Sequence, residues 1–383
     1  MKKFSVGFHD FNKDEGLNFQ LNRFYSSGLL SYDELMEIGK KVDSFECWIK
    51  LFLELAEEAA RNGDDEKEAV CLRAAHFYTL GDTKDCDGKL KKAVLYEKCF
   101  DAYSRVFDKE KNLKYERIPF ETGYLPVYVS RHTDGNKGVI VLHGGYDSFM
   151  QEFLGCGLYF FDLGYDVYFF EGPGQGEVLY RCNMKMTSEW EHCVSAVLDF
   201  YHLNDVTLIG ISLGGYLATR AAAYEPRIKR LVMFDLIYDF YGSLLARLPK
   251  IKRTILDYLT KHPGNILWKT ITKKMNKVYF LKWLFEQGYF IYDNVHTPCE
   301  YFNCIKQYNT REISGLITQD TLVLAGEKDI YTVFLNEQVN ALVHAKSVTS
   351  RLFTAKESAD HHCQIGNYPL VLSFIAEWIE KVR

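Results

Sequence analysis

The 383-residue sequence predicts an α/β fold with a mostly parallel central sheet, helices on both faces, an N-terminal helical region and a helical cap insertion. Apolar runs alternate with helix-length segments through the middle of the chain, which is typical of a parallel sheet covered on both faces. The alternation stops after Asp235 and resumes at Thr321. We therefore expect a helical region over residues 1–112 and a main domain over residues 113–383, with the cap inserted at about 236–315.

The N-terminal region is predicted to be helical from about Ser31 to Phe107. Apolar residues recur at helical spacing in 46–56, 68–78 and 89–107. Paired helices of this kind suggest a repeat array, but the segment lacks self-similarity at the roughly 34-residue period that such arrays need. We therefore expect a helical layer packed on the main domain rather than a peptide-binding array.

The predicted sheet begins with an edge hairpin, because its first two strands carry prolines and flank Thr122-Gly123. Segments 148–163, 187–201 and 213–223 between the next strands are long enough for helices. An amphipathic helix over 369–382 closes the chain. The strands are expected at 115–120, 125–129, 138–142, 166–170, 206–209, 231–234, 321–325 and 348–353.

The segment 236–315 is aromatic and basic and lacks strand patterning. An insertion at the carboxyl end of the sheet lies where active sites open in such folds, so we expect a lid. The alternative is that its aromatic residues bury themselves within the insertion or against a second subunit of a homodimer. These aromatic residues include Tyr238, Phe240, Tyr241, Trp268, Phe280, Trp283 and Phe285.

Composition narrows the classes of partner. The chain has 46 basic and 51 acidic residues without a basic stripe, which argues against nucleic-acid binding. The start of the sequence carries no sustained apolar stretch, so we expect neither a secretory signal nor a membrane span. Its ten cysteines lack zinc-type spacing. We therefore expect a cytoplasmic protein that acts on a small-molecule substrate without a metal or cofactor.

Ser212 is the candidate nucleophile. It lies in Gly210-Ile211-Ser212-Leu213-Gly214, between a predicted buried strand and a predicted helix, which is the nucleophile elbow of α/β-hydrolases. A serine on so sharp a turn takes a strained backbone conformation, and glycines let the neighbouring backbone pass beside it. The alternative is a glycine-rich turn in which the serine only caps the helix.

The other members of a catalytic triad would follow in the order acid, then histidine. Asp329 ends a predicted strand and is preferred to Glu327, while Asp235 at the end of the preceding strand is its competitor. The base is expected to be His361 or His362, on the loop after the last strand. A metal site at these histidines is disfavoured, because adjacent residues splay apart and no spaced partner completes a ligand set.

The oxyanion hole needs two backbone amides. We expect one from Leu213, directly after the nucleophile, and one from the loop after the first central strand, with Gly145 preferred and Tyr146 next. Such a donor lowers a reaction barrier by roughly 3–4 kcal/mol. The glycine-rich stretch 171–176 does not fit a phosphate loop, because no Lys-Ser/Thr pair follows it, so we expect a tight turn beside the pocket.

Four stretches together resemble the FrsA-like family of α/β-hydrolases. They are His143–Ser148, Glu171–Gly176, Gly210–Leu217 and His362–Gln364. Within that family the chain is similar to dihydroxypseudooxynicotine hydrolase and to fungal hydrolases that shorten polyketides in pigment pathways. These enzymes also have a helical N-terminal region, so the resemblance spans nearly the whole chain.

The resemblance implies a triad of Ser212, Asp329 and His362, since the histidine of the family directly precedes a Cys-Gln pair. It also implies cleavage of a carbon–carbon bond next to a ketone as an activity beside ester hydrolysis. Relatives that act on ketones can use an additional pocket carboxylate, for which Asp239 and Glu152 are candidates, with Tyr146 expected in the same pocket. The competing hypothesis is a catalytically silent scaffold whose helical region docks a partner.

Overall fold

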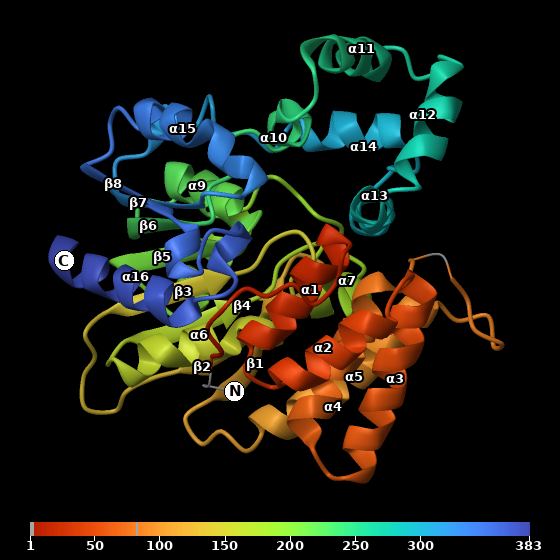
Figure 1. Ribbon diagram of the computed structural model, residues 1–383. Helices are drawn as coiled ribbons and strands as arrows, with labels where there is room; N and C mark the ends of the chain where they lie inside the picture. The colour runs from red at the N-terminus through yellow and green to blue at the C-terminus, as the bar shows by residue number, and fades with distance from the viewer. Residues whose placement is uncertain (1–3, 82) are drawn as a thin grey trace.

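The computed structural model describes residues 4–81 and 83–383, and within them the chain forms an eight-stranded sheet (Figure 1). The strand order is β1-β2-β4-β3-β5-β6-β7-β8. β2 pairs antiparallel with β1 and β4, and all other neighbours are parallel, which confirms the predicted mostly parallel sheet. The strands are β1 Lys114–Phe120, β2 Gly123–Ser130, β3 Val139–His143, β4 Asp166–Phe170, β5 Val206–Ile211, β6 Ile228–Phe234, β7 Asp320–Gly326 and β8 Ser347–Phe353.

The central strands are buried on both faces, because successive side chains point to opposite sides of the sheet. In β3, Ile140 and Leu142 join the hydrophobic cluster that includes α6 and α16, whereas Val141 joins the cluster around α8 and α9. Two cores therefore cover the sheet. The helices of the main domain are α6 Met150–Asp162, α7 Gly176–Cys182, α8 Glu191–Phe200, α9 Gly214–Tyr224, α15 Leu335–Ala341 and α16 Tyr368–Val382.

The N-terminal helices lie beside the sheet, drawn in red to orange in Figure 1. Their buried residues belong to the same hydrophobic cluster as α6 and α16. The first helix, α1, was not predicted; Asp14 caps it by accepting from two backbone amides, and Leu17, Leu21 and Phe24 form its buried face. The five helices are α1 Glu15–Ser26, α2 Tyr32–Lys41, α3 Phe45–Arg61, α4 Asp65–Tyr78 and α5 Lys91–Phe107.

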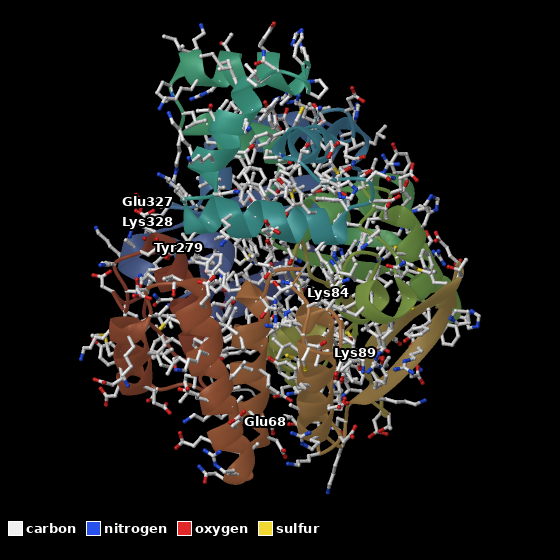
Figure 2. All side chains as sticks on the ribbon, turned by 90° about the vertical axis from the view of Figure 1, so that its right-hand side faces the viewer. Glu68, Lys84, Lys89, Tyr279, Glu327 and Lys328 are labelled. Carbon is white, nitrogen blue, oxygen red and sulfur yellow. The ribbon has the colours of Figure 1, made fainter. Side chains whose placement is uncertain are left out.

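The segment between β6 and β7 folds into five helices that rise beyond the carboxyl edge of the sheet (Figure 1). In Figure 2, α13 runs across the molecule between the other cap helices and the N-terminal helices. The five are α10 Phe240–Ala246, α11 Lys250–Thr260, α12 Leu267–Met275, α13 Tyr279–Ile291 and α14 Pro298–Ile305. Short 3-10 turns lie at Ser314–Leu316, Ile330–Phe334, Ala355–Glu357 and His362–Gln364.

The aromatic residues of the cap pack in different directions. Tyr241, Trp268 and Phe285 all pack on Phe302 and so bury one another within the cap. Phe240 instead packs on Tyr146 and Tyr331 of the main domain.

None of the helices in the described part of the chain is long and apolar enough to span a bilayer.

Candidate active site

Ser212 occupies a sharp turn between β5 and α9. Its φ of 64° lies in the left-handed region, which is strained for a residue with a side chain. The backbone N–H of Ser212 donates to Phe234 O at 2.7 Å, which ties the turn to the end of β6. A side chain on Gly210 would collide with the backbone of Gly214, so glycine is required for the helix to pass so close.

The residues predicted as nucleophile, base and acid lie in one hydrogen-bonded line. Ser212 Oγ is 2.8 Å from His362 Nε2. On the other side of the ring, His362 Nδ1 is 2.6 Å from Asp329 Oδ2. The three come from the turns after β5, β7 and β8, and the parallel strands bring these turns to the same edge of the sheet.

The charge of Asp329 controls the proton affinity of His362. Burial opposes the charged imidazolium, but the adjacent Asp329 carboxylate outweighs it and raises the pKa of His362 well above its ordinary value. Burial likewise disfavours the Asp329 carboxylate, yet His362 lowers the pKa of Asp329 overall. The pair therefore favours an ionised acid beside a strongly basic histidine.

Asp235, the alternative acid, is not part of the hydrogen-bonded line from Ser212 through His362 to Asp329. It is 0% exposed and accepts from Gln364 Nε2 at 3.1 Å and from the Cys363 amide at 3.3 Å. Burial, reinforced by the charge of Asp329, raises the pKa of Asp235 well above its ordinary value. A protonated Asp235 can donate a hydrogen bond to Asp329 and so stabilise the Asp329 carboxylate. Asp329 is therefore the carboxylate that is hydrogen-bonded to the His362 ring.

His361 faces away from the nucleophile. Its ring stacks on Phe8 with centroids 3.5 Å apart, and its Nδ1 lies 3.1 Å from Asp360 Oδ1. Of the two adjacent histidines, His362 is therefore the one that the structure directs at Ser212.

The loop after β3 lies directly against the nucleophile elbow. A side chain on Gly145 would overlap the backbone nitrogens of Leu213 and Gly214, so the glycine lets the two loops meet. In the part of the chain that the structure describes, the amides of Gly145, Tyr146 and Leu213 donate to no protein acceptor. They are thus free to bind a negatively charged oxygen, and two of them are the amides predicted for the oxyanion hole.

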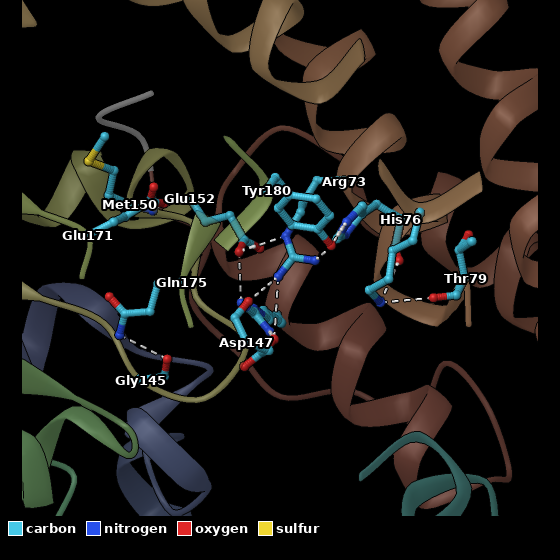
Figure 3. A network of polar contacts seen from close by, with 12 residues as sticks. Arg73, His76, Thr79, Gly145, Asp147, Met150, Glu152, Glu171, Gln175 and Tyr180 are labelled. Carbon is cyan, nitrogen blue, oxygen red and sulfur yellow. Dashed lines mark hydrogen bonds and ion pairs between the residues drawn. The ribbon is translucent and has the colours of Figure 1, made fainter. Parts of the chain in front are cut away.

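Gln175 fixes the direction of these amides. Its Nε2 donates to Gly145 O at 3.0 Å (Figure 3) and to Gly144 O at 2.9 Å, and its Oε1 accepts from the Gly172 amide at 3.1 Å. Because the C=O and N–H of a trans peptide point in opposite directions, the amides of Gly145 and Tyr146 face away from Gln175. The sequence predicted only a tight turn here. A glutamine in a glycine-rich turn after a buried strand was the available signal.

Tyr146 and the unpredicted Tyr331 form walls beside this site. Tyr146 donates from its hydroxyl to Leu284 O at 2.5 Å, and its ring lies 5.9 Å from that of Phe240 in the cap. The Tyr331 ring is 5.2 Å from the His362 ring. Tyr331 follows Asp329 by two residues, so its position depends on the same turn that places the acid.

The other two predicted pocket residues are engaged elsewhere. Asp239 caps α10 by accepting from the Gly242 amide, and it forms an ion pair of 2.6 Å with Arg311. Glu152 lies on α6 and pairs with Arg23 and Arg73. The structure therefore does not bring either carboxylate to the line that ends at Ser212.

One group in the described part of the chain has metal-like spacing. Asp235, Asp329 and His362 offer ligand atoms within 4.8 Å of one another. The 2.6 Å separation between Asp329 and His362 accommodates a shared proton and no larger ion between the two atoms. We therefore describe the group as a hydrogen-bond network.

No protein-family model matches the chain. It is similar to the hydrolase acrC of Aspergillus aculeatus, with 26% identity over 386 residues that cover 88% of each chain. It is also similar to 20-hydroxy-prefusarin hydrolase FUS2 of Gibberella moniliformis, with 29% identity over 67% of this chain and 66% of that protein.

Among solved structures, the fold matches that of 2,6-dihydroxy-pseudo-oxynicotine hydrolase. The TM-score is 0.63 at 20% identity, over 94% of this chain and 95% of that one. The fungal hydrolases and this solved structure are the proteins that the four sequence motifs led us to expect. The predicted resemblance is confirmed.

Proposed function

We propose that this chain, which is an α/β-hydrolase enzyme related to these fungal hydrolases, acts as a serine hydrolase through Ser212. The observation that carries the proposal is the hydrogen-bonded line from Ser212 through His362 to Asp329, beside three backbone amides that have no acceptor among the described residues. These are the parts that acyl transfer needs: a nucleophile, a base, a group that orients the base, and donors for an oxyanion.

In the first step, Ser212 Oγ attacks a carbonyl carbon of the substrate while His362 Nε2 takes the hydroxyl proton. Asp329 holds the ring by its Nδ1–H and stabilises the imidazolium that forms. The negative charge on the former carbonyl oxygen is bound by the amides of Leu213 and Gly145, whose direction Gln175 fixes.

Collapse of this intermediate breaks the bond to the leaving group, which receives the proton from His362 and departs. A water molecule, deprotonated by His362, then attacks the acyl-enzyme and releases the acid, so that Ser212 regains its proton. For an ester the leaving group is an alcohol. For a carbon–carbon bond next to a ketone it is a carbanion equivalent, and the proton must be delivered to carbon.

The substrate class proposed is a small carbonyl compound, either an ester or a ketone cleaved at the neighbouring carbon–carbon bond. The names of two relatives give a substrate without the bond that is cleaved: 20-hydroxy-prefusarin for FUS2 and 2,6-dihydroxy-pseudo-oxynicotine for the enzyme in the solved structure. The aromatic walls formed by Tyr146 and Tyr331 suit an apolar substrate body. A cytoplasmic location and a homodimer stay predictions.

A fluorophosphonate probe tests the proposal, because it reacts with activated serines. We expect labelling of the wild-type chain that Ser212→Ala abolishes. Absence of labelling, or labelling that persists in Ser212→Ala, would show that Ser212 is not an activated nucleophile. Short acyl esters, β-diketones and aryl ketones offered to labelling-competent protein would then separate ester from carbon–carbon hydrolysis.

A further inference from the structure

A second buried charge cluster lies on the far side of the loop that carries the oxyanion amides (Figure 3). Arg73 of α4 donates to Glu152 Oε2 at 2.9 Å and to the backbone oxygen of Asp147 at 2.7 Å. Arg23 of α1 pairs with the carboxylates of Asp147 and Glu152, at 3.0 Å each. Two guanidinium groups therefore offset two carboxylates at the junction of the N-terminal helices and the sheet.

Lys92 of α5 adds a third cation to this cluster. It is 3% exposed, and its Nζ donates to the backbone oxygens of Thr79 at 2.8 Å and His76 at 3.4 Å. An ammonium group has three donors, so one is left over. In residues 4–81 and 83–383, no carboxylate lies within ion-pair distance of Lys92. A cation buried without a paired anion is unfavourable.

The acidity of Lys92 reflects this environment. Burial, together with the charge of Arg73, lowers the pKa of Lys92 to about 7, while Asp147 and Glu286 oppose the shift only in part. An anion beside Nζ would stabilise its charged form.

A small cavity opens beside Lys92, and we call it the donor cavity. Its free interior has room for about one water-sized group. The polar side chains that line it are Arg73, His76, Lys92, Ser148, Tyr180 and Gln287.

Some side chains at this cavity have a hydrogen left to donate for which the described residues offer no acceptor. His76 Nδ1 is 3.2 Å from an Arg73 nitrogen, which can only donate, so neutral His76 carries its proton on Nε2 and donates to Tyr180 Oη at 2.7 Å. The hydroxyl hydrogen of Tyr180 is then free for another acceptor. Ser148 is 4% exposed, and its Oγ has no partner in the described residues.

We propose that the donor cavity binds one oxygen of a small monoanion, such as formate or the carboxylate end of a larger acid. The free donors are the third hydrogen of Lys92 and the hydroxyls of Ser148 and Tyr180. A negative charge placed among them completes the charge balance of the cluster. The site is independent of the proposed chemistry at Ser212, although Ser148 follows Tyr146 of the oxyanion loop by only two residues.

Formate binding to the full chain tests this site at constant ionic strength, with the bulky sulfonate p-toluenesulfonate as the counter-anion. We expect the Tm of the wild-type protein to rise with formate, because a ligand that binds the folded state stabilises it. Calorimetric titration gives the Kd directly. Lys92→Met is expected to abolish both signals.

Lys185→Met is the matched control. Lys185 Nζ also donates to a backbone oxygen, that of Phe290 at 2.8 Å, and both lysines lie over the Phe290 ring, at 5.9 Å for Lys92 and 5.4 Å for Lys185. Lys185 does not line the donor cavity. We expect its variant to bind formate like the wild type.

Two milder variants keep the test decisive if Lys92→Met does not fold. Ser148→Ala and Tyr180→Phe each remove one hydroxyl, and each is expected to weaken formate binding about fivefold to tenfold. Equal affinity in wild type and all three variants, or no formate-dependent change in wild type up to about 100 mM, would overturn the proposal.

Competition then identifies the source of the anion. If the acidic end of a substrate fills the cavity, formate will inhibit cleavage of p-nitrophenyl hemisuccinate and spare p-nitrophenyl acetate. If a free anion fills it, formate will bind without competing with either ester. Both results support the anion site. If formate does not bind at all, the anion proposal fails, and the labelling test of Ser212 is unaffected.

Discussion

The two ends of the loop after β3 face two buried charge clusters, and these clusters shift the pKa of a histidine in opposite directions. At the triad, the carboxylate of Asp329 raises the pKa of His362 despite burial. At the junction with the N-terminal helices, burial and then the cations Lys92 and Arg73 lower the pKa of His76 well below its ordinary value. The same side chain is thus a strong base in one place and a neutral hydrogen-bond relay in the other, because the sign of the neighbouring charge differs.

This difference shows which cluster is suited to proton transfer. His362 can take a proton from Ser212 and hold it while a bond breaks. His76 holds Tyr180 and Arg73 in place and does not change charge near neutral pH. Variants on the triad side are therefore expected to change turnover, and variants on the helical side to change ligand binding.

Removing the nucleophile is the largest expected effect. Ser212→Ala should fold normally and lower kcat by about four to six orders of magnitude, as loss of a triad member does in other serine hydrolases. Steady-state kinetics with an accepted ester measures the loss, and circular dichroism checks the fold. A variant that keeps a tenth of the wild-type rate would exclude Ser212 as nucleophile.

Exchanging the acid comes next. Asp329→Asn should lower kcat by about three to four orders of magnitude, because an amide cannot hold His362 in the correct tautomer and does not stabilise the imidazolium. Asp235→Asn should cost about tenfold or less, since Asp235 touches the acid and not the ring. Measuring kcat of the two variants side by side tests this ranking. A larger loss in Asp235→Asn than in Asp329→Asn would assign the acid to the end of β6.

Gln175 should have an intermediate effect. Gln175→Leu releases the carbonyls of Gly144 and Gly145, so the oxyanion amides lose their fixed direction, and kcat should fall about tenfold to a hundredfold. Gln338→Leu is the control, because Gln338 is also buried and bonded to Thr310 and Ser314 but lies away from the elbow.

The two glutamine variants should lose similar stability in thermal unfolding. Only Gln175→Leu should also weaken the binding of a trifluoromethyl ketone, which forms an oxyanion on Ser212. Equal inhibitor affinity in both variants would mean that Gln175 serves the fold alone.

The pH profile reports the charge of His362. The base must be neutral, so kcat/KM should fall as pH drops through the pKa of His362, at up to about tenfold per unit. Because Asp329 raises that pKa, the midpoint should lie above the ordinary value near 6.5. In Asp329→Asn the residual activity should show a lower midpoint. An unchanged midpoint would mean that Asp329 does not control the base.

The cap should have the smallest effect. Phe240 is 2% exposed and packs against Tyr146 and Tyr331, so Phe240→Leu should change the ratio of kcat/KM values across acyl chain lengths by a few-fold. Phe280 is 41% exposed, and Phe280→Leu should leave the ratio unchanged. Identical profiles for both variants and wild type would show that Phe240 does not shape the pocket.

The sequence predicted the features that depend on local signals. The elbow around Ser212 and the loop before Tyr146 are short motifs, and apolar runs mark the strands that carry them. The choice between Asp329 and Asp235 required coordinates, because both end neighbouring strands and only the turn geometry separates them. α1 was missed although Asp14 and the spacing of its apolar residues mark it.

The donor cavity could not be predicted from any local sequence pattern. Its donors Lys92, Ser148 and Tyr180 come from α5, the loop after β3 and α7, and each is unremarkable among its sequence neighbours. The same holds for Glu152, which sequence reasoning placed near the substrate and which the structure pairs with Arg23 and Arg73. Partner choice among buried charges depends on packing between distant segments.

The central claim, that Ser212 carries the acyl group, is tested most directly by mapping the covalent intermediate. The wild-type chain would be mixed with p-nitrophenyl acetate, quenched in acid within the first turnovers and digested for mass spectrometry. The account predicts an acetyl group on the peptide containing Ser212, and none on the corresponding peptide of Ser212→Ala. Ester turnover with the acyl group on another residue, such as Cys363, or with Ser212→Ala as active as wild type, would contradict it.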